Sequence, residues 1–201
     1  HSFPTRRSSD LVLNNDIELT EGSIGLIESM YKKASKKKVG IVGCTLLYGN
    51  ERDIQHAGIF LMPEGMADHM YVRERYQTAL KQVGSEKFPY DITKDMPMTA
   101  VTGAAQLVRK SSFEKIGGFD EKFIICGGDV DLCIRMNESG LQTWFVGGGY
   151  MLHKESISRK FIPIPAEDFY NSYISYIKGY DPEIGDPFLP EITKKIKIHG
   201  V

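Results

Sequence analysis

The stretch L-V-L-N-N-D-I-E-L at residues 11–19 begins with an apolar run and becomes polar at Asn14, Asn15 and Asp16. This pattern predicts a strand that leads into a turn. In open α/β sheets, ligands gather at the carboxyl ends of strands, and oxygen ligands there suit Mg²⁺ or Mn²⁺ holding a diphosphate. Taken alone, the pattern is explained more simply by a turn closed by an Asx hydrogen bond. The metal site is therefore a hypothesis that depends on the rest of the chain.

The residues that follow predict strands that alternate with helices. Apolar residues at helical spacing after Thr20 predict a helix that ends in a lysine run. Residues 63–97 are polar and predict a long loop with one short helix near 76–83. A glycine-rich flexible turn is expected at 147–149. Strands are expected at 39–48, 54–61, 99–109 and 141–146, and further helices at 111–116, 130–139 and 166–178. This alternation favours an α/β sandwich over an all-β fold.

A second acidic motif, G-G-D-V-D-L-C-I-R at residues 127–135, lies at the start of a predicted helix. Acidic residues are favourable at helix N-termini whatever their function. Asp129 and Asp131 point to different faces of such a helix, so they are not expected to share one role. Asp131 is four positions before Arg135 and is expected to pair with it, whereas Asp129 is the better candidate for a group exposed to a cleft.

His153 follows the predicted glycine-rich turn and begins the segment H-K-E-S-I-S-R at residues 153–159. A lone histidine is more often structural than a ligand. Together with Lys154 and Arg159, however, it forms a cationic cluster of the kind that binds a pyrophosphate.

These pieces resemble, in family order, the motifs of bacterial family 2 glycosyltransferases. L-N-N-D at 13–16 resembles the modified D-x-D motif of that family, and G-G-D-V-D-L-C-I-R-M at 127–136 resembles its acidic helix. The other blocks are V-G-I-V-G-C-T-L-L-Y at 39–48, I-Q-H-A-G at 54–58, V-T-G-A-A-Q-L-V-R-K at 101–110, F-E-K-I-G-G-F-D-E-K-F at 113–123 and H-K-E-S-I-S-R at 153–159.

The resemblance implies a GT-A fold, a mixed Rossmann-like sheet flanked by helices. It also implies an inverting transferase that uses Mg²⁺ or Mn²⁺ and a nucleotide-diphosphate sugar. Asp129 matches the catalytic base, and Asn14, Asp16 and His153 match the metal site. Residues expected to line the donor and acceptor are Asn15, Gly103, Ala104, Lys154 and Arg159. One departure is Gly128, because many members have Glu or Asn immediately before the base.

The resemblance also predicts how the chain is organised. Residues 1–11 lack the apolar core of a secretory signal. They are either a disordered basic leader or, as expected here, a non-native leader similar to a translated sequencing-library adapter. Residues 12–160 are expected to form a partial GT-A domain without its N-terminal nucleotide-binding half, followed by a helical extension at 161–201. Such a chain is expected to bind donor poorly and to be inactive alone.

The composition limits the kinds of binding partner and the cellular location that can be expected for the chain. The formal net charge of −1 gives no reason to expect nucleic acid, and no apolar stretch is long enough to span a bilayer. The three cysteines lack metal-ligand spacing and fit a reducing compartment. The chain is expected in the cytoplasm, or at the inner face of the membrane through peripheral association.

The predicted function is sugar transfer to a saccharide or lipid-linked acceptor in cell-surface polysaccharide synthesis. A GT-A-like nucleotidyltransferase and a non-catalytic carbohydrate-binding or scaffold domain remain as alternatives. Geometry discriminates between them, because the transferase requires Asp16, Asp129 and His153 to lie around one site.

Overall fold

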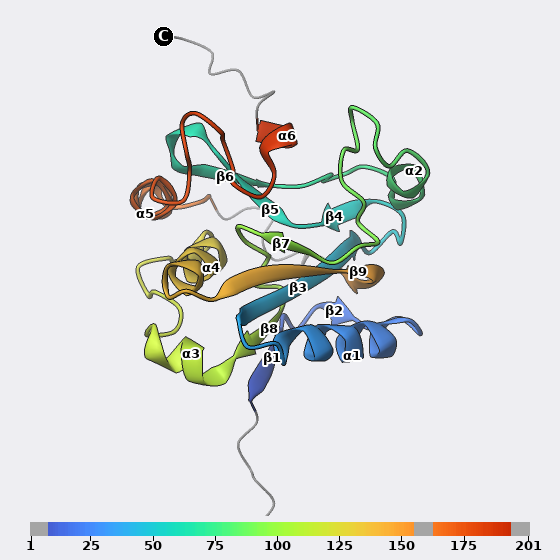
Figure 1. Cartoon of the computed structure of the whole chain (residues 1–201), viewed down its shortest axis with the longest axis horizontal. Helices are drawn as coiled ribbons and strands as arrows, with labels where there is room; N and C mark the ends of the chain where they lie inside the picture. Colours follow the sequence, from blue (N-terminus) through green and yellow to red (C-terminus); the bar gives the residue numbers. More distant parts are fainter. Residues whose placement is uncertain (1–7, 155–162, 194–201) are drawn as a thin grey trace, which may run out of the picture.

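A computed structural model of the chain describes residues 8–154 and 163–193. Its centre is a mixed sheet in the order β1-β8-β3-β9-β2, with β4 paired to β3 and β7 paired to β9 (Figure 1). β3 and β9 are parallel, and the other pairs of this sheet are antiparallel. The strands are β1 (Ser9–Leu13), β2 (Ile17–Glu18), β3 (Val39–Tyr48), β4 (Ile54–His56), β7 (Met96–Met98), β8 (Ala105–Arg109) and β9 (Gln142–His153).

Helices cover both faces of this sheet. The helices are α1 (Ser23–Ala34), α2 (Tyr76–Lys81), α3 (Lys110–Lys115), α4 (Gly128–Glu138), α5 (Ala166–Tyr176) and α6 (Pro190–Thr193). Val42, Cys44 and Leu46 of β3 are buried in a cluster with Leu26 and other apolar residues of α1. Ile41 instead packs in a cluster with α4. Because successive strand residues point to opposite faces, α1 and α4 lie on opposite sides of β3, which explains its nearly continuous apolar sequence.

The segment 63–97 contains more structure than the expected loop. It includes the 3₁₀ helix η1 (Pro63–Gly65), β6 (Met66–His69), α2 and β7. β6 pairs with β5 (Ile59–Met62) in a small second sheet. Phe88 and Ile92 are fully buried in a cluster with Met98 and Phe145. The helix predicted near 76–83 is confirmed as α2, and residues 82–95 form neither helix nor strand, as the loop prediction expects. The prediction is wrong for residues 63–69 and 96–97, which form η1, β6 and the start of β7. The buried side chains of Phe88 and Ile92 fix the loop itself to the main sheet.

The turn predicted at Gly147–Gly149 is wrong, because β9 continues through it as one 12-residue strand. The pairing with β3 shifts there, from Cys44 opposite Val146 to Thr45 opposite Tyr150, so the glycines form a bulge. A Cβ on Gly147 would lie 2.3 Å from the backbone of Thr93, which explains the need for glycine. The bulge keeps β9 in the sheet and carries the strand on to His153.

Two boundaries of the expected organisation can be placed on the structure. Residues 9–11, assigned to a leader, form the start of β1, where Ser9 pairs with Arg109 and Leu11 with Leu107. In the described part of the expected 161–201 extension, α5 packs against α4 and α6 against β5. In Figure 1, these two helices lie on the α4 side of the sheet, opposite α1. The domain boundaries themselves stay predictions.

Candidate active site

The first part of the site forms where β1 and β2 meet the ends of two distant strands. Asn14 directly follows β1, and its N–H donates to the carbonyl of Ala104 at 2.9 Å. Ile17 in β2 pairs with His153 at the end of β9. The N–H of Lys154 then donates to the Asp16 carbonyl at 3.0 Å. The short polar turn at 14–16 is thus held between β8 and β9.

Asn14, Asp16, Gln55 and His153 form what we call the His153 cluster. His153 Nε2 lies 3.0 Å from Asp16 Oδ1 and 3.5 Å from Asn14 Nδ2. On the other side of the ring, His153 Nδ1 lies 2.6 Å from Gln55 Oε1. The structure therefore brings together the three residues that the sequence assigned to a metal site, and it adds Gln55.

Asp16 and His153 could contribute two ligands to a divalent cation, but they do not form a complete metal site by themselves. Within residues 8–154 and 163–193, no group of three or more His, Cys, Asp or Glu is arranged to hold a metal ion. Asp16 and His153 offer one carboxylate and one imidazole, with the Asn14 carboxamide beside them. Mg²⁺ is commonly held by one or two protein carboxylates together with substrate phosphates and water, and Mn²⁺ accepts imidazole as well. These residues could hold such an ion if a diphosphate completed its ligands.

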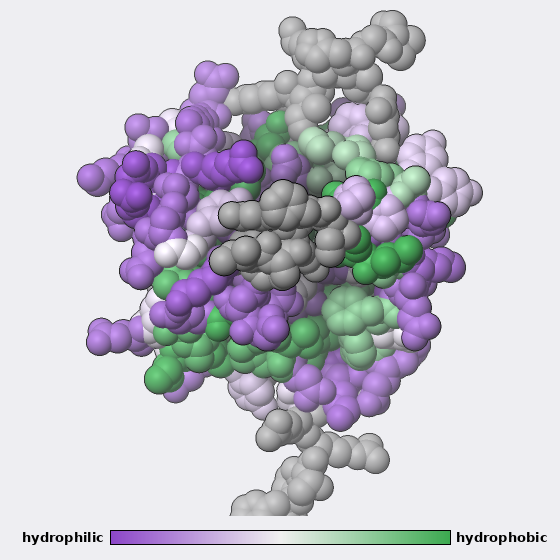
Figure 2. Space-filling model, turned by 180° about the vertical axis from the view of Figure 1, so that it is seen from behind, coloured by the Kyte–Doolittle hydropathy of each residue, from purple (hydrophilic) through white to green (hydrophobic). Residues whose placement is uncertain are grey.

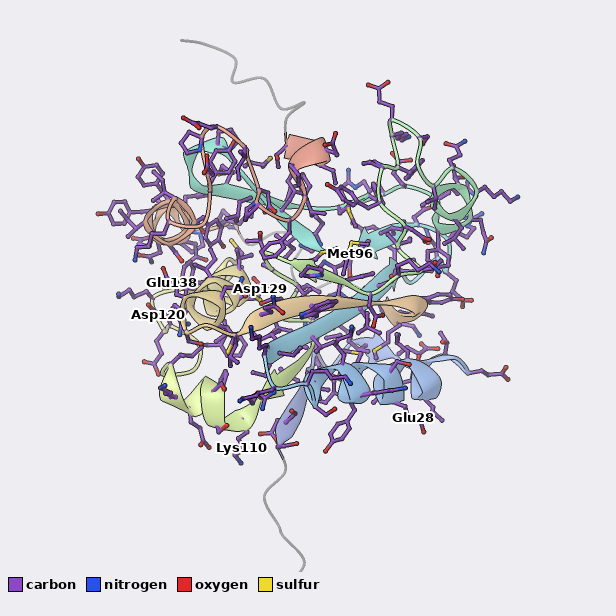
Figure 3. All side chains as sticks on the ribbon, viewed as in Figure 1. Glu28, Met96, Lys110, Asp120, Asp129 and Glu138 are labelled. Atoms are coloured by element: carbon purple, nitrogen blue, oxygen red, sulfur yellow. The ribbon has the colours of Figure 1, made fainter. Side chains whose placement is uncertain are left out.

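Asp129 lies in the first turn of α4, on the side of the helix toward the centre of the molecule (Figure 3). Its Oδ2 accepts the N–H of Gly103 at 2.8 Å, and its Oδ1 accepts the N–H of Val130 at 2.9 Å. A Cβ on Gly103 would lie 3.1 Å from the Asp129 Cβ, so a glycine allows this close approach.

Hydrogen bonds connect Asp129 to the His153 cluster. Gly103 binds the Asp129 carboxylate, and the neighbouring Ala104 accepts the N–H of Asn14. The two acidic motifs of the sequence, which contain Asp16 and Asp129, therefore flank one turn at 102–104. A cavity of about 130 Å³ lies elsewhere, between the end of α4 and the chain near Phe188.

Asp131 does not take part in this arrangement. Its Oδ2 forms an ion pair with the Arg135 guanidinium at 2.7 Å, and its Oδ1 accepts a hydrogen bond from Ser175 at 2.7 Å. The side chain is buried between α4 and α5. The predicted pairing of Asp131 with Arg135 is confirmed.

The loop that leads to Asp129 is held by α5. The buried Asp168 carboxylate accepts the N–H groups of Ile124, Ile125 and Cys126 at 2.7, 2.8 and 2.9 Å. Tyr176 donates its hydroxyl to the Gly127 carbonyl at 2.8 Å. Burial alone would raise the pKa of Asp168, but the three backbone donors outweigh it and hold the pKa below its ordinary value. The carboxylate is thus ionised and fixes the loop.

The turn at 102–104 is held by a hydrogen bond to the side chain of His56. The ring is fully buried, and its Nε2 lies 3.2 Å from the Gly58 nitrogen and 3.4 Å from the Thr102 nitrogen, both of which donate to it. Burial and the neighbouring His69 lower the pKa of His56 well below its ordinary value. His56 is therefore neutral and serves as an acceptor beneath the turn.

The remaining predicted residues lie around this centre or outside the described residues. Asn15 is exposed on the polar turn. Lys154 pairs with Glu18, whose hydrogen bond and charge raise the lysine pKa. Arg159 lies outside the described residues.

Sequence reasoning missed the supporting residues Gln55, His56 and Asp168. For Gln55 and His56 a signal existed, because they are two polar residues inside the apolar run at 54–61. Asp168 gave no such signal, since an acidic residue in the first turn of a helix is ordinary.

Comparison with known proteins gives the chain its relatives. A family model described as the N-terminal domain of galactosyltransferase matches residues 86–157. The chain is 35% identical over 185 residues to the O-antigen biosynthesis protein RfbC of Myxococcus xanthus, covering 91% of this chain and 14% of that protein. Over 64 residues it is 34% identical to the N-acetylglucosaminyl-diphospho-decaprenol L-rhamnosyltransferase of Mycobacterium tuberculosis, covering 32% of this chain and 21% of that enzyme. The chain thus spans a small part of the length of each.

A solved structure shares the fold. The crystal structure of GalNAc-T7 with UDP, GalNAc and Mn²⁺ matches 88% of this chain and 32% of that one, with a TM-score of 0.50 and 12% identity. The expected mixed α/β sheet flanked by helices is confirmed, and it matches the sheet of a GT-A glycosyltransferase. The chain therefore shares a fold with this structure, and its sequence is similar to those of an O-antigen biosynthesis protein and a rhamnosyltransferase.

Proposed function

We propose that this chain carries the acceptor-side part of a family 2, inverting glycosyltransferase active site. The enzyme would move a sugar from a nucleotide-diphosphate sugar to a saccharide or lipid-linked acceptor in cell-surface polysaccharide synthesis. The observation that supports this most strongly is the hydrogen-bonded connection from Asp129 through Gly103–Ala104 to the His153 cluster. The names of the relatives, an O-antigen biosynthesis protein and a rhamnosyltransferase, suggest the substrate class.

In this proposal Asp129 is the general base. Its carboxylate takes the proton of the acceptor hydroxyl as that oxygen attacks the anomeric carbon. The bond from the anomeric carbon to the diphosphate oxygen breaks on the opposite face, and its electron pair leaves with the nucleoside diphosphate. The configuration at the anomeric carbon is therefore inverted.

The His153 cluster would hold the leaving group. Asp16 and His153 would bind Mg²⁺ or Mn²⁺, which supplies positive charge to the departing diphosphate. Asn15, Lys154 and Arg159 would contact the donor or acceptor, and Gly103 and Ala104 would line the sugar pocket. The Lys154 ammonium first has to leave Glu18 for this role.

A donor screen tests the function. The complete gene product is incubated with a panel of nucleotide-diphosphate sugars, saccharide and lipid-linked acceptors and Mn²⁺, and nucleoside diphosphate release is followed. We expect acceptor-dependent release with one donor class, an inverted anomeric configuration in the product by NMR, and loss of turnover with EDTA that added Mn²⁺ or Mg²⁺ restores. A product that retains the donor configuration would contradict the inverting mechanism, and turnover unaffected by EDTA would contradict the metal site.

A further inference from the structure

Gln55 is the member of the His153 cluster that has no role in the proposed mechanism, and it lies on β4. β4 pairs with β3 antiparallel, and β3 pairs with β9 so that Tyr48 lies opposite His153. This arrangement places Gln55 Oε1 2.6 Å from His153 Nδ1, although 98 residues separate them in the sequence. Gln55 is 7% exposed, so solvent competes little for this contact.

The contacts on the two ring nitrogens of His153 favour one proton position. A carboxamide oxygen can only accept, so the ring must carry its proton on Nδ1 to bond Gln55 Oε1. A neutral imidazole has a single N–H, which leaves a lone pair on Nε2. The Asn14 amide, 3.5 Å from Nε2, can donate to that lone pair. The contacts with Gln55 and Asn14 are therefore both compatible with a proton on Nδ1.

The lone pair on Nε2 also faces Asp16 Oδ1 at 3.0 Å. When Nε2 is unprotonated, it and the carboxylate oxygen are both hydrogen-bond acceptors, so their lone pairs face each other and repel. Only a proton or a cation between them makes so short a contact favourable. With the Nδ1 proton held by Gln55, the cluster presents a nitrogen and an oxygen to the same cation.

We propose that Gln55 is a positioning residue, which holds His153 in the tautomer that leaves Nε2 free to bind a divalent metal together with Asp16. The inference rests on the proposed role of Asp16 and His153 as metal ligands. Metal-binding histidines generally donate their other ring N–H to an oxygen acceptor, and loss of that acceptor weakens metal binding.

His56, the next residue of β4, has partners of its own. Because its Nε2 accepts two backbone N–H groups, the neutral ring carries its proton on Nδ1, which lies 3.3 Å from His69 Nδ1. His56 then supports Thr102, at the start of the turn that binds Asp129. β4 thus supports both sides of the site, the His153 cluster through Gln55 and the turn at 102–104 through His56.

The tautomer can be measured directly on the unmodified chain. Histidine nitrogens are labelled with ¹⁵N, and two-dimensional long-range ¹H–¹⁵N spectra are recorded without metal at about pH 8, where an ordinary imidazole is neutral. We expect His153 to give the pattern of a ring that carries a proton on Nδ1, because Gln55 Oε1 accepts that proton. A ring protonated on Nε2 alone would overturn the proposal without any variant being needed.

Variants then test what the tautomer does for metal binding, with Mn²⁺ alone as the probe and calorimetry as the measurement. Gln55→Leu, which removes the acceptor, should weaken Mn²⁺ binding by about 10- to 100-fold. Gln55→Glu, which keeps an acceptor oxygen, should retain both the Nδ1 proton and Mn²⁺ binding. His153→Ala should abolish Mn²⁺ binding.

The outcomes separate the two levels of the argument. If His153→Ala abolishes binding while Gln55→Leu leaves it unchanged, the role of Gln55 is wrong and the metal site stands. If His153→Ala leaves Mn²⁺ affinity unchanged, the metal site in the proposed function is wrong.

Discussion

His56 shows how a single buried side chain can set the pH response of this fold. It has no exposed surface and accepts N–H groups from Gly58 and Thr102. Burial, followed by the charge on His69, lowers its pKa well below the ordinary value of 6.5. As pH falls below 6.5, the unfolded chain binds a proton at this residue and the folded chain does not. Stability contributed by the neutral ring is therefore present above that pH and is lost below it.

We accordingly expect the unfolding free energy to fall by roughly 1 kcal/mol per pH unit as pH drops below the ordinary histidine range. Denaturant titrations at a series of pH values between about 8 and 5 measure this slope. His56→Gln, which cannot titrate, should be less stable at neutral pH and should show a shallower slope. An identical slope in the variant would mean that another group causes the acid sensitivity.

At the scale of elements, side chains of α5 form hydrogen bonds that hold the loop before Asp129 in place. Asp168 binds three successive backbone N–H groups of that loop, and Tyr176 binds Gly127 next to it. α5 therefore fixes the residues that precede the proposed base, although these hydrogen bonds do not involve Asp129 itself. Several apolar side chains of α5, including Phe169, Tyr173 and Ile174, remain exposed.

Asp168→Asn should therefore destabilise the fold, because one amide cannot accept three N–H groups as well as a carboxylate does. We expect a loss of about 2 kcal/mol in unfolding free energy, and in the active enzyme a lower kcat with little change in donor KM. Because the folded pKa of Asp168 is depressed, its contribution is present above the ordinary value of 3.8 and disappears as pH falls through the folded pKa.

Glu167→Gln on the same helix is the matched control, since Glu167 is exposed. It should leave stability and kcat unchanged. Equal effects of the two substitutions would show that the charge of α5, and not the loop contacts of Asp168, is responsible.

Some of these elements could be predicted from local sequence patterns, and others could not because they depend on contacts between distant residues. The strand at Val39–Tyr48 and the helix at Gly128–Glu138 could be predicted because an apolar run and acidic residues at the start of a helix are local features of the sequence. The glycines at 147–149 looked like a turn, since nothing local shows that the backbone near Thr93 packs against them and that β9 continues. Gln55 likewise has no local link to His153, because their contact depends on two strand pairings.

At the scale of the whole molecule, the sheet brings the ends of β1, β2, β4 and β9 and the turn before β8 together. The motif residues could be predicted to belong to one site only through family resemblance, because the Asp16–His153 contact spans 137 residues. None of the helices in the described parts of the chain has the length and apolar character needed to cross a bilayer. The face in Figure 2 carries apolar residues interspersed with polar ones.

The central claim is that Asp129 is the general base of a sugar transfer for which the His153 cluster holds the diphosphate. Once the donor is known, kcat of Asp129→Asn in the complete gene product tests it most directly. Glu138→Gln, at the exposed far end of α4 (Figure 3), is the control. We predict that Asp129→Asn lowers kcat by about 100-fold or more, with Mn²⁺ affinity unchanged and Glu138→Gln fully active. Turnover by Asp129→Asn equal to that of the control would contradict the account.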